Sequence, residues 1–433
     1  MRCSLKRISY LLMLGIIFTL FFTNIVNPNT LHLLAWGAKD ETLNNEQKCA
    51  GFWIINHVYI NENDPLNNWA TIEATYPWCS GSGDHDDPYI IEDVFINGGG
   101  EGICIHIMNS NVYFEIQNCT LTNASYGIKL DYTTKGYIYS NKLKNNNASG
   151  VGLFNSNENF IHSNSFYDNS IDGIYLSESE RNVITHNNIS FNDYYGIRLH
   201  VSNENAVVNN TIVYSELGIE IYGDENEIIY NFIYNNTGTG IKLMEANQNR
   251  IAANFFYHNL NSGLDFYQSD TNRITSNIIN NNSQGIVLYD SDSNILTCNN
   301  ITKNRFYGVY LDNLTNDNSV SLNNFIENCL APSSLANSQA YDWDKDSENM
   351  FSQNYWDDWN GNGGYGIDGP SGTFTNEDSD PLDSPTDIYD CPPLGDVVIG
   401  LSGTIFLLIL CIAFASLVVC AKKRKFIELR FES

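Results

Sequence analysis

Side chains that can bind or react recur along the middle of the sequence at intervals of 22 or 23 residues. One series consists of Tyr175, Arg198, Glu220, Lys242 and Asp265. A second series, two residues further along, includes His200, Tyr222, Tyr267, Tyr289 and Asp312. Stacked in register, such residues would form columns of flat rings and charges, a mixture that suits a sugar chain. The predicted ligand-binding residues are Tyr175, Tyr222, Tyr267, Tyr289 and Asp312.

Two carboxylates of the first series could instead perform acid–base catalysis. Glu220 and Asp265 would lie two strand spacings apart, about 9.6 Å, which is the wide spacing of inverting glycosidases. Lys242, Arg198 and His200 complete the catalytic candidates. However, alternating charge also suits pairing between neighbouring strands. The sequence has no Gly-His-Gly, Arg-Ile-Lys or Asp-Pro-His motif of polysaccharide-cleaving solenoids. Binding or a structural role is therefore favoured over catalysis.

Two acidic stretches, AYDWDKDSEN and DDWNGNGGYGID, resemble the oxygen-rich loops that bind Ca²⁺. The candidate ligands are Asp342, Asp344 and Asp346 in the first stretch and Asp358, Asn360, Asn362 and Asp368 in the second. Neither stretch has the terminal Glu in register, so a solvated acidic loop is the alternative. Copper would need clustered His, Cys or Met. The eight His are scattered, although Cys104 and His106 are expected to face outward on one strand. No cofactor is required, Ca²⁺ is compatible, and copper is not supported.

A repeat must position these residues. Each unit opens with Gly-apolar-x-apolar, and every gap between units is 22 or 23 residues except the first, of 25. The opening glycines are Gly102, Gly127, Gly150, Gly173, Gly196, Gly218, Gly240, Gly263, Gly285 and Gly308. The apolar pair has the two-residue period of a strand, and Asn or Gly interrupts the sequence too often for a helix. Each unit is predicted to contain three short strands joined by tight bends.

Asn also recurs in three columns, represented in one unit by Asn182, Asn187 and Asn192. Asn tolerates the left-handed backbone of a sharp corner, so these residues are predicted to turn the corners. Stacked amides can hydrogen-bond from coil to coil, which would satisfy them when buried.

These patterns predict an all-β fold, a right-handed parallel β-helix of about ten coils. A leucine-rich-repeat horseshoe has a similar period but needs only one Asn per repeat. We expect an N-terminal cap with first strands over residues 38–101, the β-helix over 102–328 and a C-terminal cap over 329–369, because the ends of a solenoid must be covered.

The two ends of the chain predict that its middle part lies outside the cell and is attached to the membrane. Residues 1–37 combine a basic start with a long apolar run, typical of a signal peptide or N-terminal anchor. Residues 370–396 hold five of the ten prolines and read as an acidic spacer. Residues 397–421 are apolar and uncharged, as a transmembrane helix requires, and the basic tail 422–433 is predicted to be cytoplasmic. The net charge of −28 disfavours nucleic acid as a partner.

Covalent modification is expected in an extracellular chain. Cys49 with Cys79, and Cys329 with Cys391, are candidate disulfides, although connectivity cannot be read from sequence. Nine Asn-x-Ser/Thr sequons are candidate glycosylation sites: Asn118, Asn123, Asn147, Asn188, Asn209, Asn235, Asn281, Asn300 and Asn313.

The cap sequences carry a family resemblance. WCSGSGDHDDPYIIEDVFING (residues 78–98) precedes the coils, and NYWDDWNGNGGYGIDGP (residues 354–370) and DSDPL follow them. Together with the coils, over residues 50–382, this resembles the NosD-like right-handed β-helix family of the pectate-lyase-like superfamily. The resemblance implies a membrane-anchored surface form with a binding or structural role, a polysaccharide or glycoprotein being the favoured partner. A polysaccharide lyase, hydrolase or epimerase and a periplasmic copper-handling accessory protein are the alternatives.

Overall fold

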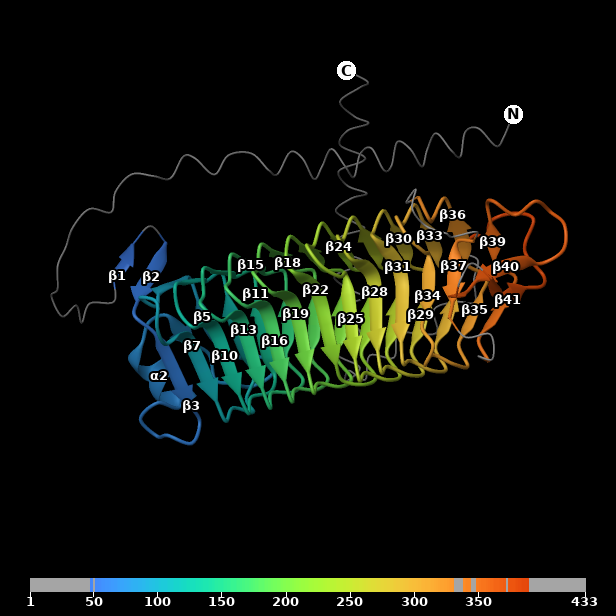
Figure 1. The fold of residues 1–433 in the computed structure, drawn as a ribbon. Helices are drawn as coiled ribbons and strands as arrows, with labels where there is room; N and C mark the ends of the chain where they lie inside the picture. Colours follow the sequence, from blue (N-terminus) through green and yellow to red (C-terminus); the bar gives the residue numbers. More distant parts are fainter. Residues whose placement is uncertain (1–46, 50, 331–337, 344–347, 371–372, 389–433) are drawn as a thin grey trace, which may run out of the picture. The chain divides into compact units, whose positions relative to one another are not determined.

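A computed structural model describes residues 47–49, 51–330, 338–343, 348–370 and 373–388. These residues lie in one compact unit, in which parallel strands stack into a solenoid of about twelve turns (Figure 1). Each turn contributes three strands, as predicted. The expected count of ten was too low, because strands before residue 102 and after residue 328 join the same stacks and so form coils inside the predicted caps.

The first strands of successive turns form one column. They are β3 (Val58–Asn61), β7 (Ile103–Met108), β10 (Tyr126–Asp131), β13 (Ser149–Phe154), β16 (Asp172–Ser177), β19 (Tyr195–His200), β22 (Leu217–Tyr222), β25 (Ile241–Met244), β28 (Ser262–Tyr267), β31 (Gln284–Tyr289), β34 (Val309–Leu311), β37 (Ala340–Asp342) and β40 (Tyr365–Asp368). We call the outer side of this column the first-strand face.

The second strands form the second-strand face. They are β5 (Tyr89–Glu92), β8 (Phe114–Gln117), β11 (Gly136–Tyr139), β14 (Phe160–His162), β17 (Val183–Thr185), β20 (Ala206–Val208), β23 (Glu227–Ile229), β26 (Arg250–Ala252), β29 (Arg273–Thr275), β32 (Ile295–Thr297), β35 (Ser319–Ser321), β38 (Met350–Ser352) and β41 (Phe374–Asp378). The short strand β4 (Cys79–Ser80) pairs antiparallel with β5.

The third strands form a separate sheet, whose outer side is the third-strand face. They are β2 (Phe52–Ile55), β6 (Val94–Asn97), β9 (Thr120–Thr122), β12 (Lys142–Lys144), β15 (Ser165–Tyr167), β18 (Asn188–Ser190), β21 (Thr211–Val213), β24 (Phe232–Tyr234), β27 (Phe255–Tyr257), β30 (Ile278–Asn280), β33 (Asn300–Thr302), β36 (Asn324–Ile326) and β39 (Tyr355–Trp356). Strand β1 (Gln47–Cys49) pairs antiparallel with β2.

The repeat period sets the register. Ile174 pairs with Ile197 and Leu176 with Leu199, so each inward side chain stacks on its counterpart in the next turn. Ile174, Leu176, Ile184 and Ile189 are fully buried in one continuous core. Burial of such stacked apolar side chains is the main stabilising contribution in a fold of this type.

The opening glycine allows successive turns to approach closely. A Cβ added to Gly173 would lie 2.6 Å from the carbonyl oxygen of Gly196, too close for any other residue without a backbone shift. In the first of these turns the position belongs to Cys104, since Ile103 pairs with Tyr126 and Ile105 with Ile128. The prediction that Gly102 opens the first unit was therefore wrong. Counted from Cys104 to Gly127, the first gap has the same length as the others.

The Asn columns form buried amide ladders, as predicted, but the Asn do not adopt the left-handed backbone. The residue before each ladder Asn does: Arg181, His186 and Phe191 have φ of 54°, 55° and 55°. The ladder Asn therefore serves hydrogen bonding alone. The Oδ1 of Asn187 accepts from the backbone N–H of Asn164 at 2.9 Å, and Asn187 Nδ2 donates to Asn210 Oδ1 at 3.0 Å.

The ends of the solenoid are closed by aromatic stacks and by acceptors for the ladders. Near the N-terminus, the single described helix α2 (Trp69–Thr75) places Trp69 on Tyr89, with ring centroids 5.0 Å apart. Near the C-terminus, Trp356 stacks between Phe325 and Tyr365. Asp378 Oδ2 accepts from the backbone N–H and the Nδ2 of Asn354, at 3.0 and 3.1 Å, which ends one ladder.

The predicted disulfides are not formed. Cys79 is a free thiol buried in the core, and Cys329 is a free thiol whose Sγ donates to the carbonyl oxygen of Ser338 at 3.2 Å. Both thiols are therefore engaged in local packing. Cys391 and the predicted transmembrane helix lie outside the described residues. Within the described ranges, the structure contains no helix with the length and apolar character of a membrane span.

Candidate ligand-binding face

The first-strand face carries the predicted column of charged residues. Register pairs Tyr175 with Arg198, Arg198 with Glu220, Glu220 with Lys242, and Lys242 with Asp265. The stacking that the period predicts is thus confirmed, while the roles given to these residues remain predictions.

Charge pairing within this column separates the two proposed acid–base residues. Arg198 Nε donates to Glu220 Oε2 at 2.8 Å, and the Glu220 side chain is 12% exposed. Lys242 stands between Glu220 and Asp265 in the register. Burial raises the pKa of Asp265 to about 6, and Lys242 opposes that rise. Glu220 is therefore committed to an ion pair, and the two carboxyls do not face a common gap.

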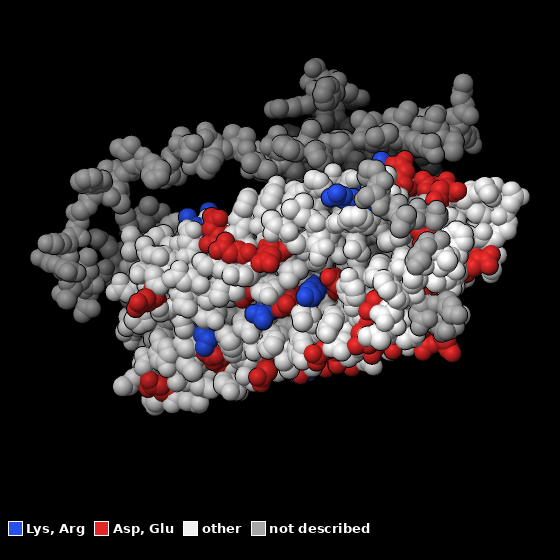
Figure 2. Space-filling view, viewed as in Figure 1, with Lys and Arg blue, Asp and Glu red and all other residues white. Residues whose placement is uncertain are grey.

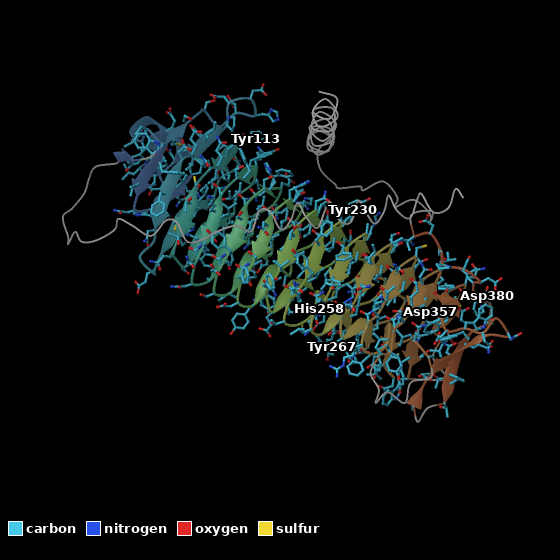
Figure 3. The ribbon with its side chains drawn as sticks, turned by 90° about the horizontal axis from the view of Figure 1, so that it is seen from above. Tyr113, Tyr230, His258, Tyr267, Asp357 and Asp380 are labelled. Carbon is cyan, nitrogen blue, oxygen red and sulfur yellow. The ribbon has the colours of Figure 1, made fainter. Side chains whose placement is uncertain are left out.

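The second series also stacks, and two of its tyrosine rings, Tyr267 and Tyr289, are exposed. His200 stacks on Tyr222, with ring centroids 5.5 Å apart, and Tyr222 donates to Glu245 at 2.9 Å. Tyr267 is 45% exposed and Tyr289 36%. Figure 3 shows Tyr267 at the edge of the solenoid, directed away from the strands. Asp312 follows β34, and its Oδ1 accepts from the backbone N–H of Asp290 at 3.1 Å.

A buried carboxyl that the sequence reading missed lies beside the first column. Asp172 is 3% exposed, and its Oδ2 accepts from Ser149 Oγ of the preceding turn at 3.0 Å. The other oxygen, Oδ1, is buried without a hydrogen-bond partner. Burial raises the pKa of Asp172 to about 7, while the Ser149 bond and Arg198 act in the opposite direction. The signal available in the sequence was its place before a column glycine, in register with Tyr195.

Two tyrosine rings flank Arg198, a positive charge that acts on this carboxyl. The Arg198 guanidinium lies 4.9 Å from the ring centroid of Tyr195 and 5.4 Å from that of Tyr175. Both contacts fall within cation–π range. Burial raises the pKa of Tyr195, and Glu220 adds to the effect. We refer to Ser149, Asp172, Tyr175, Tyr195, Arg198 and Glu220 as the Asp172 cluster; it offers hydroxyls, a guanidinium, carboxyls and two ring faces within a few neighbouring turns.

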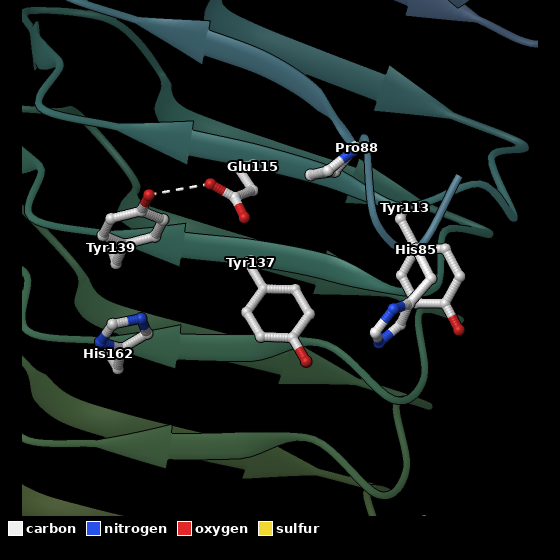
Figure 4. A pocket seen from close by; sticks show the side chains of 7 residues that line it. All are labelled: His85, Pro88, Tyr113, Glu115, Tyr137, Tyr139 and His162. Atoms are coloured by element: carbon white, nitrogen blue, oxygen red, sulfur yellow. Dashed lines mark hydrogen bonds between the residues drawn. The ribbon is translucent and has the colours of Figure 1, made fainter. Parts of the chain in front are cut away.

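A hollow of about 280 Å³ lies on the second-strand face near the N-terminal end (Figure 4). Its lining consists of His85, Pro88, Tyr113, Glu115, Tyr137, Tyr139 and His162. Tyr139 donates to Glu115 Oε2 at 2.8 Å, and His162 stacks on Tyr139 with centroids 5.0 Å apart. Burial lowers the pKa of His162 to about 4, which leaves the ring neutral at pH 7. This hollow was not predicted, since it depends on the loop that brings His85 and Pro88 over β8 and β11.

The corner where first strands end is strongly acidic. Figure 2 shows acidic side chains along the lower edge of the solenoid, with few cationic ones. The acids of this corner are Glu178, Glu180, Glu204, Asp224, Glu225, Glu245, Asp270, Asp290, Asp292, Asp312 and Asp317. Several of them accept backbone N–H groups from the adjacent turn, as Asp270 does from Asp292 at 2.7 Å.

Four of the predicted calcium ligands, Asp342, Asp358, Asn360 and Asp368, act as hydrogen-bond acceptors within the C-terminal turns. Asp342 accepts from the Asn349 and Asn376 amides at 3.3 and 3.1 Å. Asp358 accepts from Gln339 at 2.9 Å and from Tyr365 at 3.1 Å. Asp368 accepts from the Ser338 backbone at 3.1 Å, and Asn360 from that of Asn362 at 3.0 Å. Asp344 and Asp346 lie outside the described residues.

No three His, Cys, Asp or Glu of the described segments form a group that could hold a metal ion. The expected outward Cys104 is in fact fully buried, because it occupies the inward glycine position. His106 pairs with Asp131 at 2.5 Å instead.

These features define the class of protein by its fold: a right-handed parallel β-helix. Residues 87–266 match the model of the periplasmic copper-binding protein NosD, and residues 208–325 match that of the right-handed β-helix region. No curated protein matches the chain. The residues described here offer no copper site, so no copper binding is assigned to them from this match.

Several solved structures are similar in architecture. The A-module of the mannuronan C-5 epimerase AlgE6 of Azotobacter vinelandii matches at 17% identity and TM-score 0.47, covering 54% of this chain and 78% of that one. The Dettilon tailspike protein matches at 14% identity and TM-score 0.46, covering 60% of each chain. PfbA, a surface adhesin of Streptococcus pneumoniae, matches at 12% identity and TM-score 0.43, covering 55% of this chain and 80% of that one. At these values no activity or ligand is transferred.

Proposed function

We propose that the protein is a membrane-anchored surface protein whose solenoid binds glycan chains along the first-strand face. The observation that carries this proposal is the Asp172 cluster, where two tyrosine rings flank an arginine held by Glu220. Sugar rings pack on aromatic faces, and their hydroxyls hydrogen-bond to charged groups held in fixed positions. The exposed rings of Tyr267 and Tyr289 extend the same face over further turns, which suits a polymer longer than one sugar. The apolar segments near the two ends of the sequence support the membrane anchor and the extracellular location in this proposal.

The test is a screen of the detergent-solubilised full chain against a panel of polysaccharides, with binding and product release measured together. Arg198→Ala should weaken binding by at least tenfold. Tyr230→Ala is the matched control, because that ring is 45% exposed but lies at a corner away from the first-strand face. Absence of binding to every glycan, or equal losses in both variants, would contradict the proposal.

A polysaccharide lyase, hydrolase or epimerase is the second candidate, favoured by one observation. Asp172 and Asp265 have pKa values raised by burial to about 7 and about 6. A carboxyl that keeps its proton near neutral pH can act as a general acid. Catalysis predicts product release from a bound polysaccharide that Asp172→Asn abolishes without loss of binding. Binding without release in the unmodified protein would leave the binding function alone.

A further inference from the structure

The sequon asparagines gather around one of the three strand columns. Asn188 and Asn300 open the third strands β18 and β33. Asn118 and Asn209 occupy the left-handed corner two residues before the start of β9 and β21. Asn123, Asn235 and Asn281 occupy the left-handed corner directly after β9, β24 and β30. Asn147 follows β12 by three residues. Asn313, in the turn after β34, lies beyond the end of a first strand and away from the third strands.

The fold itself separates these asparagines from the ladders. Two residues after Asn182 and Asn187 come Ile184 and Ile189, which are fully buried. A Ser or Thr cannot occupy that inward position without loss of the core, so these ladder asparagines do not begin a sequon. The nine sequon asparagines are exposed or half-buried, whereas the ladder asparagines are buried. The potential acceptors are therefore on the surface, and eight of the nine border the third-strand face.

We propose that this face is a glycosylated side, carrying N-linked oligosaccharides that leave the first- and second-strand faces bare between residues 58 and 311. The inference rests on the proposed extracellular location. The donor would be a lipid pyrophosphate-linked oligosaccharide, used by an oligosaccharyltransferase. The Asn Nδ2 would form a bond to C1 of the first sugar as the C1–oxygen bond to the lipid pyrophosphate breaks. The pyrophosphate leaves with the bonding electrons, and a base of the transferase accepts one amide proton.

The surroundings of each amide rank the sites. Asn118 donates to Asp93 at 2.5 Å, Asn123 to Asn97 at 2.9 Å, and Asn147 to the Gly100 carbonyl at 2.6 Å. Within the part of the chain that the structure describes, the exposed side chains of Asn188 and Asn209 make no such bond. The attached sugar replaces a hydrogen of Nδ2, so amides without a protein partner lose nothing. Among the eight sites beside the third-strand face, Asn188 and Asn209 should therefore have the highest occupancy.

A rod decorated in this way has two kinds of surface. The bulky, hydrated oligosaccharides would prevent close contact along the third-strand face. The Asp172 cluster and the aromatic hollow would stay accessible, since neither the first- nor the second-strand column contains a sequon asparagine between residues 58 and 311. The glycans would then direct the ligand toward the bare faces.

The test is glycopeptide mass spectrometry of the full chain isolated from cells that naturally produce it. The peptide with Asn209 should carry an oligosaccharide mass that Thr211→Ala removes and Thr211→Ser retains, since both changes leave Asn209 in place. Glycans absent from all eight sites, or confined to Asn313, would overturn the inference.

Labelling of intact cells with a membrane-impermeant amine reagent, read at the exposed Lys142, tests location separately. A labelled but unglycosylated protein would refute the glycosylated side and leave the surface location standing. An unlabelled, unglycosylated protein would refute both.

Discussion

The hydroxyl of Ser149 donates a hydrogen bond to the carboxyl of Asp172 in the next turn, with 3.0 Å between Oγ and Oδ2. Both residues are buried. This contact places a buried, protonatable acid at the start of a first strand. Its environment yields a prediction about stability and pH.

Asp172→Asn should change how stability depends on pH. The folded carboxyl keeps its proton to about pH 7, whereas an unfolded Asp loses it near pH 4. Between these values the folded state binds more protons, so the free energy of unfolding falls as pH rises and levels off above the folded pKa. Removal of this group should lessen that fall, by up to about 4 kcal/mol. Urea unfolding of the unmodified protein and of Asp172→Asn at pH 4, 6 and 8 measures this difference. If the free energy of unfolding depends on pH in the same way in both, the raised pKa of Asp172 is contradicted.

Asn164→Ala should destabilise the solenoid strongly. Its Oδ1 accepts from the Asn141 backbone at 3.0 Å, and its Nδ2 donates to the Ile138 carbonyl at 2.8 Å. Loss of the amide leaves buried groups without partners, at a cost of about 3 kcal/mol or more. Ser165→Ala, at the adjacent outward position, should change the free energy of unfolding by less than about 0.5 kcal/mol. Equal losses in both variants would show that the ladder is not the cause.

Ser215→Asn should stabilise the protein. In the third ladder Ser215 replaces the usual Asn: its backbone donates to Asn236 at 3.0 Å, but its hydroxyl is buried without a partner. An amide there could accept from Asn192 in the preceding turn and restore the missing rung. The expected gain is about 1 kcal/mol, seen as a higher Tm. Ser215→Ala removes the hydroxyl without adding a rung; a variant no more stable than this control would refute the explanation.

Tyr175→Asn should block ligand binding in a glycosylating cell. The change completes an Asn-x-Ser sequence with Leu176 and Ser177, which puts an acceptor on the first-strand face. Tyr175→Gln also removes the ring but creates no sequon. If the glycan ligand binds this face, affinity should fall more in the asparagine variant, and enzymatic removal of its oligosaccharide should bring the two variants level. Unchanged binding in a variant shown to be glycosylated would place the ligand elsewhere.

The sequence predicts the repeating parts of this molecule well, because in a solenoid the repeat period of the sequence determines which residues of neighbouring turns pair. Ile174 must stack on Ile197 once 23 residues form one turn. The burial of Asp172 could not be read in the same way, since it depends on which side chains Ser149, Tyr195 and Arg198 place around it. The left-handed backbone was predicted at the ladder Asn, whereas the residue before it adopts that conformation. The two are neighbours in the sequence, and Asn has the stronger general propensity for the left-handed conformation.

Local departures from the repeat were also beyond a sequence reading. Cys104 fills a glycine position, so the Gly-apolar-x-apolar pattern aligns on Gly102 instead. The hollow near His162 depends on a loop from outside the repeat, and the free thiols of Cys79 and Cys329 reflect packing that spacing does not encode.

The amide ladders give the rod a direction and a fixed length. In this ladder, each Asn donates hydrogen bonds to the Asn of the next turn, from Asn141 to Asn164 and onward to Asn354. The last acceptor is the Asp378 carboxylate, which has no hydrogen to pass on. A second molecule set end to end would meet an acceptor where a donor is needed. The C-terminal turns thereby stop the pattern from continuing into a fibre, although every coil before them is a template for another.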